Sequence, residues 1–190
     1  PQRAISDVLE NAGLKREDMG YVLATGYGRN SMLEIADQQM SELSCHARGA
    51  SFLFPEVHTV IDIGGQDVKV LQIENGVMTN FAMNDKCAAG TGRFYEAMAR
   101  SFEMSLPEFS NLSLTAKNVI PITAQCTVFA ESEVITLVGE GKPMDEIAAG
   151  IQMAVAKRCF VMSKKAGATD SITLTAGTIT VRAEGGRMLV

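Results

Sequence analysis

Clusters of basic residues are absent from this sequence of 190 residues. Its 17 lysines and arginines are scattered among 22 aspartates and glutamates, which gives a formal net charge of −5. Proteins that bind nucleic acid through its phosphates need a basic face. The sequence therefore argues against nucleic acid as a partner.

Long apolar runs are lacking as well, although 46% of the residues are hydrophobic. No stretch approaches the roughly 18–20 apolar residues that a membrane-spanning helix needs. No signal peptide opens the sequence, which begins within an amphipathic segment, PQRAISDVLENAG. We expect a cytoplasmic protein that does not enter a membrane.

Cysteine and histidine are both sparse. Four cysteines in a chain with enough apolar material for an ordinary core argue against a disulfide framework and fit a reducing compartment. The two histidines, His46 and His58, have no acidic cluster beside them in the sequence, which argues against a histidine metal site. Cys45 and Cys159 lie in ordinary helical patterns, and we interpret them as packing residues.

Strand-like and helix-like segments alternate along the chain. Apolar residues at helical spacing predict helices over 2–12, 31–49 and most of 92–167, with an interruption at 119–123. Short β-rich runs predict one strand within 21–28, three within 58–84 that are separated at Gly64-Gly65 and at the Asn75-Gly76 turn, and one within 171–177. Such alternation is typical of α/β proteins. We place a boundary near 84–92, which divides the chain into an N-terminal α/β domain over 1–86 and a partial second α/β domain with a helical insert over 87–190.

The stretch VIDIGGQDVKV indicates a turn that could hold phosphate. A buried strand delivers Asp62, and Gly64 and Gly65 let backbone N–H groups approach an anion closely. Asp62 could hold Mg²⁺ through its waters, and Gln66 and Asp67 could orient a water or a terminal phosphate. A β-hairpin whose two glycines merely make a tight turn explains the same pattern.

Two cysteines, Cys87 and Cys126, each precede a predicted helix. Helix N-termini favour anions and lower the pKa of a thiol. A 4Fe-4S cluster bound by four thiolates is anionic, and two cysteines from each of two identical chains would supply all four ligands across a symmetric interface. The alternative, that both thiols are small buried packing residues, is left open by the local pattern.

Several blocks together resemble one family of proteins. The chain is similar, from about residue 2 to about 176, to the activators of (R)-2-hydroxyacyl-CoA dehydratases, within the BadF/BadG/BcrA/BcrD ATPase family. The blocks that carry this resemblance are ATGYGRN, ADQQMSELSCHARGASF, VHTVIDIGGQDVKV, NDKCAAGTGRF and CTVFAESEVI. The resemblance implies the actin-like fold that is shared with acetate and sugar kinases and heat-shock cognate chaperones.

The resemblance also implies a site and an activity. Cys87 and Cys126 of each chain would bind one 4Fe-4S cluster at the interface of a homodimer. Asp62 and the turn 64–67 would bind ATP and Mg²⁺, with Asp62 and Gln66 as the catalytic residues. Ferredoxin or flavodoxin would reduce the cluster, and ATP hydrolysis would drive the electron to a separate dehydratase component.

Three other functions remain as alternatives. The ATPase subunit of a benzoyl-CoA reductase belongs to the same family and would use the same cysteines. A sugar kinase of the same fold would have no use for paired cysteines at helix ends. A non-catalytic iron–sulfur dimerisation module would hold the cluster without binding ATP.

The resemblance breaks down at both ends of the chain. Members of the family begin with a hairpin that carries a first phosphate loop, and they continue past the last strand into an adenosine motif. The chain starts after that hairpin, and its last 14 or so residues are atypical of the family. We therefore expect a fragment that lacks the first phosphate-loop strands and the C-terminal adenosine region.

Overall fold

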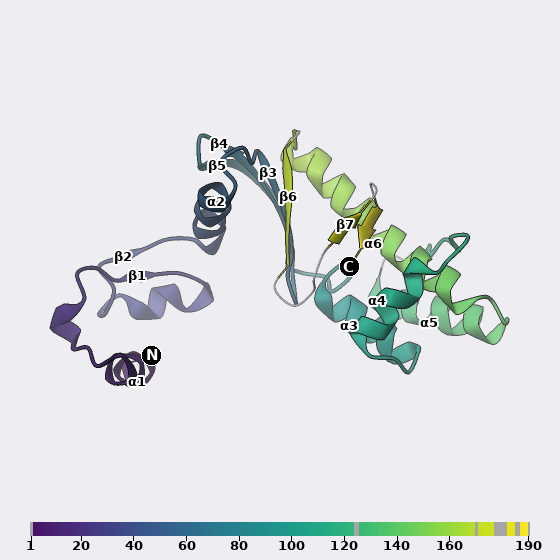
Figure 1. Cartoon of the computed structure of the whole chain (residues 1–190), viewed down its shortest axis with the longest axis horizontal. Coiled ribbons are helices and arrows are strands. Elements are labelled where there is room, and N and C mark those ends of the chain that lie inside the picture. The colour runs from purple at the N-terminus through teal and green to yellow at the C-terminus, as the bar shows by residue number, and fades with distance from the viewer. Residues whose placement is uncertain (1, 124–125, 170, 177–181, 185–186, 190) are drawn as a thin grey trace.

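The computed structural model describes residues 2–123, 126–169, 171–176, 182–184 and 187–189. Helices and strands alternate along the chain, as the α/β prediction requires (Figure 1). In chain order the elements are α1 (Gln2–Ala12), η1 (Arg16–Asp18), β1 (Leu23–Ala24), η2 (Tyr27–Met32), β2 (Gln38–Gln39), α2 (Glu42–Leu53), β3 (Thr59–Ile63), β4 (Val68–Glu74), β5 (Val77–Asn84), α3 (Gly92–Ser101), α4 (Leu106–Leu114), α5 (Thr127–Gly139), α6 (Met144–Ala166), β6 (Ile172–Ala176), β7 (Arg182–Glu184) and β8 (Arg187–Leu189).

The central sheet has four strands in the order β5-β4-β3-β6. β3, β4 and β5 pair antiparallel through two short connections, and β6 returns to pair parallel with β3. The second connection is the predicted Asn75-Gly76 turn, where both residues have positive φ, 52° and 75°. Positive φ at two successive positions is the requirement that Asn-Gly meets in a tight hairpin. The three strands predicted within 58–84 are therefore confirmed.

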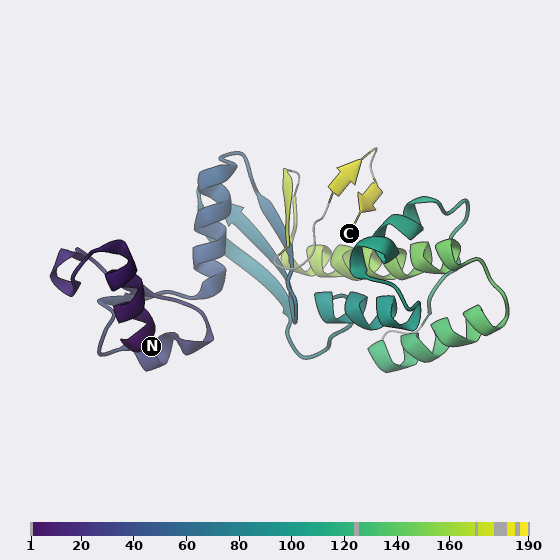
Figure 2. The same cartoon turned by 60° about the horizontal axis from the view of Figure 1, so that its bottom comes forward.

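Helices cover both faces of this sheet (Figures 1 and 2). On one face, α2 packs Ala47 and Ala50 against Val60, Leu71 and Ile73. On the other face, α6 packs against β4 and β5, and α3, α4 and α5 extend the same core away from the sheet. Because successive strand residues face opposite sides, β3 and β4 place apolar residues on both faces of the sheet, with Asp62 and Lys69 among them on the α2 face.

The helical half follows its sequence signals closely. Ser105 caps α4 in a capping box with Glu108, and α6 ends at Gly167, which has a φ of 75°. The predicted interruption at 119–123 is an extended segment that lies against α6, where Ile120 N donates to Glu146 O at 3.1 Å. Gly150 makes this approach possible, because a Cβ there would overlap the carbonyl oxygen of Ile120.

One predicted helix, over 31–49, is partly wrong. The chain forms the short 3₁₀ helix η2 up to Met32 and the two-residue strand β2, and α2 begins only at Glu42. Ser41 fixes that start, because its hydroxyl accepts a hydrogen bond from Ser44 N. Parallel pairing of β2 with β1 takes the preceding residues out of the helix. The strand predicted within 21–28 is correspondingly short, at Leu23–Ala24.

The first forty residues form a separate part of the molecule, at the left of Figures 1 and 2. The helix α1 matches its predicted range and ends at Gly13, with a φ of 66°, but it contains no buried residue. The prediction of atypical residues over 177–190 falls mainly on positions outside the described part of the chain. The proposed division at 84–92 remains a prediction.

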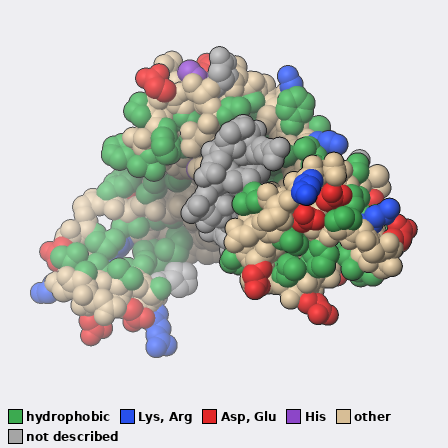
Figure 3. Space-filling model, turned by 45° about the vertical axis from the view of Figure 1, so that its right-hand side comes forward, with side chains coloured by type: hydrophobic (Ala, Val, Ile, Leu, Met, Phe, Trp, Pro, Cys, Tyr) green, Lys and Arg blue, Asp and Glu red, His purple; other side chains and the backbone are tan. Residues whose placement is uncertain are grey.

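The surface agrees with the charge pattern of the sequence. On the face shown in Figure 3, basic and acidic side chains lie among one another, with hydrophobic side chains exposed between them. Within the part of the chain that the structure describes, no helix is both long enough and apolar enough to span a membrane.

Candidate phosphate site and cysteine loop

A row of polar side chains crosses three neighbouring strands on the face of the sheet that α2 covers. Lys69 of β4 lies directly opposite Asp62 of β3, and Asp62 lies opposite Thr175 of β6. Thr175 Oγ1 donates to Asp62 Oδ1 at 2.8 Å, and Lys69 Nζ lies 3.6 Å from Asp62 Oδ2. Asp62 and Lys69 each expose only 10% of their side chains. The predicted aspartate is therefore held from both sides.

Lys69 is the cation among three carboxylates. Its Nζ donates to Asp67 Oδ1 at 2.7 Å and lies 3.5 Å from Glu42 Oε1 on the first turn of α2. Burial lowers the pKa of Lys69, but the hydrogen bond to Asp67 and the charges of Asp67, Asp62 and Glu42 outweigh burial and raise it above its ordinary value. Lys69 is therefore charged, and the three carboxylates exceed it by two negative charges.

His46 contacts the same row from α2. Its Nε2 lies 3.0 Å from Thr175 Oγ1, and its Nδ1 lies 3.8 Å from Asp62 Oδ2. Since the Thr175 hydroxyl donates to Asp62, the Nε2–H of His46 is the donor to Thr175. The sequence predicted that no acidic cluster surrounds His46; in the structure one carboxylate, that of Asp62, lies beside it.

The turn 64–67 is tightly closed. Gly64 N donates to Asp67 O at 2.9 Å, and a Cβ on Gly64 would collide with the Asp67 carboxylate. Gln66 is exposed at the tip. The antiparallel hairpin considered for this stretch is therefore present, and it places Asp62, Asp67 and the two glycines at one corner of the sheet.

The turn rests on the start of α3. Gly92 N donates to Gly64 O and Arg93 N to Gly65 O, both at 2.9 Å. Gly92 permits this contact, because a Cβ at that position would lie 3.1 Å from the Cα of Gly65. The first free N–H groups of a helix usually bind a capping side chain or an anion. In α3 two of them bind the carbonyl groups of the glycine turn instead.

The loop with Cys87 leads directly into this junction. Cys87 is partly exposed and packs against the larger core, five residues before α3 begins. Asn84, at the end of β5, donates through Nδ2 to the carbonyl oxygens of Cys87 and Ala89. The sequence predicted a thiol near a helix N-terminus, and the structure inserts one further turn between the thiol and the helix.

Cys126 lies at a helix N-terminus, as predicted. It is the N-cap residue of α5, is partly exposed, and accepts a hydrogen bond at its carbonyl from Ala130 N. The side-chain oxygen of the next residue, Thr127, is buried, and no described residue forms a hydrogen bond with it. Of the two cysteines assigned to packing, Cys159 is buried as expected, whereas Cys45 is partly exposed.

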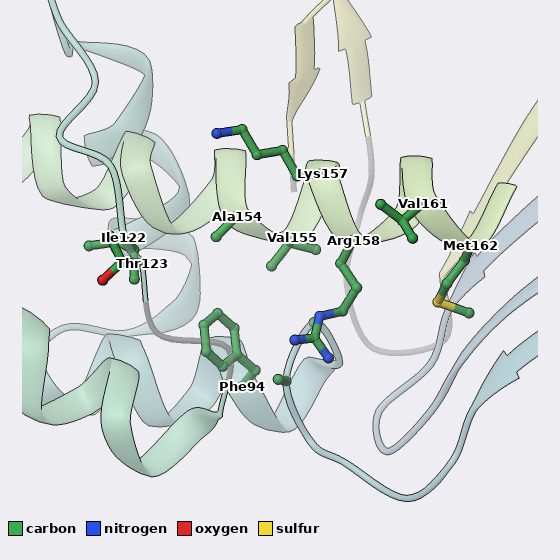
Figure 4. Close-up of a pocket in the computed structure, with 11 residues that line it drawn as sticks. Phe94, Ile122, Thr123, Ala154, Val155, Lys157, Arg158, Val161 and Met162 are labelled. Carbon is green, nitrogen blue, oxygen red and sulfur yellow. The ribbon is translucent and has the colours of Figure 1, made fainter. Parts of the chain in front are cut away.

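A cavity of about 410 Å³ lies between α6 and the segment before α3 (Figure 4). Ala89 and Gly90 form one wall, two residues from the junction with the glycine turn. Arg158 reaches from α6 toward this wall, where its Cδ would lie 2.9 Å from a Cβ on Gly90. The volume is within the roughly 300–1,000 Å³ of small-molecule sites.

The donor atoms fit the groups that the sequence suggested. Carboxylate oxygens with excess negative charge suit Mg²⁺, which keeps several waters and binds one or two carboxylates together with phosphates. Two partly exposed thiols suit a chain that shares a cluster with a second copy. Among the described residues, no group of three or more metal-ligating side chains comes together. A metal at either place therefore needs ligands from a nucleotide, water or a partner chain.

The aspartate near the end of a buried strand and the glycine turn after it agree with the phosphate loop expected of an α/β ATPase with the actin-like fold. The chain belongs to the BadF/BadG/BcrA/BcrD ATPase family, whose model matches residues 2–186. The family predicted from the sequence blocks is therefore confirmed, together with the fold.

Three relatives illustrate the comparison. The chain is 55% identical to the (R)-2-hydroxyglutaryl-CoA dehydratase activating ATPase of Acidaminococcus fermentans, and the match covers 93% of this chain and 68% of that protein. The crystal structure of that protein superposes on this chain with a TM-score of 0.82. The chain is 47% identical to the 2-hydroxyisocaproyl-CoA dehydratase activator of Clostridioides difficile, covering 93% and 66%; the structure of that activator with bound ADPNP gives a TM-score of 0.78. Identity falls to 34% for one of the subunits of benzoyl-CoA reductase from Thauera aromatica, covering 93% and 62%. The chain spans about two thirds of the length of the two activators.

Proposed function

We propose that this chain is the ATP-dependent activator of a 2-hydroxyacyl-CoA dehydratase, to which it passes a low-potential electron. The observation that carries the proposal is the junction at which Gly92 and Arg93 donate to the carbonyls of Gly64 and Gly65. Through it, a change in the phosphate turn displaces the start of α3 and the Cys87 loop before it. Relatives at 55% and 47% identity that are named as dehydratase activators support the same function.

In the proposed ATP site, each residue of the turn has a separate task. Asp62 holds Mg²⁺ through water, and the N–H group of Gly65 faces the phosphates, because that of Gly64 already donates to Asp67 O. Gln66, exposed at the tip, orients the attacking water, and Asp67 holds Lys69 beside the site. The cavity next to Gly90 is the place for the remainder of the nucleotide, with Arg158 on its wall.

Cys87 and Cys126 are the proposed ligands of a 4Fe-4S cluster that is shared with a second copy. When bound, such a cluster supplies a one-electron carrier of low potential. An exposed apolar face on α5 beside Cys126 supports a homodimer: Val128, Phe129 and Ile135 expose 67%, 71% and 58% of their surface. Apolar side chains gathered on one helix face are typical of an interaction surface.

The proposed partners follow from this activity. Ferredoxin or flavodoxin supplies the electron in the cytoplasm, and the dehydratase component receives it. A benzoyl-CoA reductase is the second candidate for the receiving enzyme, supported by a relative at 34% identity. The lower identity makes the dehydratase the better supported partner.

An activation assay tests the proposal. Reconstituted, reduced protein is mixed with a 2-hydroxyacyl-CoA dehydratase component and ATP, and dehydration of the acyl-CoA is measured. We expect ATP-dependent activation that is lost in Asp62→Asn and in Cys126→Ser and retained in Cys45→Ser, a thiol that is partly exposed like Cys126. Activation without ATP, or activation that survives Cys126→Ser, would contradict the proposal.

A further inference from the structure

Three consecutive carbonyl groups of the Cys87 loop are held by side chains and backbone of the same chain. Asn84 Nδ2 donates to the carbonyl oxygen of Cys87 at 2.9 Å and to that of Ala89 at 3.2 Å. Between them, the carbonyl oxygen of Ala88 accepts from the N–H of Thr91 at 3.0 Å and from its hydroxyl at 2.6 Å. Three consecutive carbonyl groups therefore face Asn84 and Thr91.

The N–H groups of the same peptides face the other way. In a planar trans peptide the N–H of one residue is opposite the carbonyl of the residue before it. The N–H groups of Ala88, Ala89 and Gly90 thus turn away from Asn84 and Thr91, and no acceptor for them lies among the residues that the structure describes. Ala89 and Gly90 are buried, and buried N–H groups nearly always have an acceptor. We therefore expect an acceptor beyond the described residues.

We propose that Asn84 is a positioning residue for Cys87. By holding the loop carbonyls, Asn84 presents the N–H groups of Ala88 and Ala89 to the sulfur of Cys87 and to the sulfides beside it. Hydrogen bonds to cluster sulfur stabilise the more negative, reduced form. Asn84 therefore raises the reduction potential. The inference rests on the proposed function, since it requires that Cys87 binds the cluster.

The place of Asn84 in the fold suits this role. It is the last residue of β5 and pairs with Val68, which follows the glycine turn at the start of β4. Its amide nitrogen carries two donors, one for each carbonyl, whereas an aspartate at the same position offers only acceptors. Asn84 thus connects the sheet corner that carries the turn to the loop that carries the thiol.

The test compares the cluster's midpoint potential in wild type, Asn84→Ala, Asn84→Asp and Asn80→Ala after anaerobic reconstitution. Asn80 is the matched control, because its Nδ2 also donates from β5 to a backbone carbonyl, that of Ala166 at 3.1 Å, away from Cys87. For both Asn84 variants we expect a lower midpoint potential. At a fixed applied potential the ratio of oxidised to reduced cluster should rise on the order of tenfold, which corresponds to about 59 mV for one electron. The Asn80 variant should keep the wild-type value.

Iron content and thermal unfolding are measured on the same samples. Loss of iron in the Asn84 variants, with folding retained and iron retained in Asn80→Ala, also supports the proposal. A wild-type potential in the Asn84 variants, or an equal effect of all three changes on potential and folding, overturns the proposal and leaves the cluster itself in place. A wild-type protein that takes up no iron overturns both this inference and the proposed function.

Discussion

At the residue scale, the charge of Lys69 holds together the carboxylates beside the turn 64–67. Its ammonium lies within 3.6 Å of carboxylate oxygens on Asp62, Asp67 and Glu42. In a buried group of this kind, removing one partner costs more than the pair contributes, because the remaining charges lose their compensation. Lys69 thus stabilises a cluster of carboxylates that is otherwise suited to a divalent cation.

The first prediction is a pH-dependent loss of stability in Lys69→Met. At pH 7 we expect unfolding in urea to show a loss of about 3–5 kcal/mol, the usual cost of breaking a buried ion pair. Because the folded-state pKa of Lys69 is raised, its stabilising contribution is complete below its ordinary value of 10.5 and is lost as pH rises through the folded pKa above that value. The difference between wild type and variant should therefore shrink above pH 10.5.

The exposed Lys117 provides the control for this change. Lys117→Met should change the free energy of unfolding by less than about 0.5 kcal/mol. Equal effects of the two substitutions would mean that the ion pairs of Lys69 contribute nothing to stability.

The second prediction concerns Tyr95, whose side chain is fully buried on α3. Its hydroxyl finds no hydrogen-bond partner among the described residues, and burial, followed by the nearby thiol of Cys159, raises its pKa. An unpaired buried hydroxyl costs about 1–3 kcal/mol of desolvation. We expect Tyr95→Phe to match or exceed the wild type in free energy of unfolding, and Tyr27→Phe, at an exposed position, to change nothing. A clear loss of stability in Tyr95→Phe would show that the hydroxyl has a partner.

At the element scale, the contacts of helices with backbone decide the architecture. α3 begins against the carbonyls of the glycine turn, and α6 lies so close to the 119–123 segment that only glycine fits at position 150. In both contacts, backbone packs directly against backbone instead of through side chains. This explains why α3 contains Gly92 and α6 contains Gly150, although glycine lowers helix propensity.

The third prediction follows from the close approach of α6. Gly150→Ala places a methyl group against the carbonyl of Ile120, and we expect a loss of about 1–3 kcal/mol in the free energy of unfolding. Gly139→Ala is the matched change, because a Cβ on that helical glycine meets nothing within 4 Å, and it should be neutral or stabilising by up to about 1 kcal/mol. A neutral result at position 150 would require the 119–123 segment to shift without cost.

Sequence patterns predicted an element correctly where the signal lies within that element, and less well where the element depends on pairing with distant residues. The Asn75-Gly76 turn and the long helix α6 were readable because each signal lies within the element that it defines. The range 31–41 was mistaken for helix, because the parallel pairing of β2 with β1 depends on residues fifteen positions away. Asp62 and Gly64 were found from a motif, whereas Lys69 and Thr175 join the site only through the register of three strands.

At the scale of the whole molecule, the proposed function depends on a second copy of the chain. Each chain offers two candidate thiols, and among the described residues no group of three or more metal-ligating side chains comes together that could hold a cluster within one chain. The apolar face of α5 begins directly after Cys126, so that association through this face brings that thiol to the interface.

The fourth prediction tests that face. We expect the double variant Val128→Lys with Ile135→Lys to remain folded but to lose dimerisation and iron together, because charges cannot be buried in an apolar interface without large cost. Val77→Lys, which changes an exposed valine on β5, should retain both properties. A double variant that remains a dimer would place the interface elsewhere; native mass and iron content decide between these results.

The most direct measurement counts iron per chain alongside native mass after anaerobic reconstitution, with Cys87→Ser and Cys126→Ser as comparisons. A shared 4Fe-4S cluster predicts about two irons per chain in a dimer, lost in either variant. A well-folded monomer without iron would contradict the shared cluster and leave Cys87 and Cys126 as packing residues.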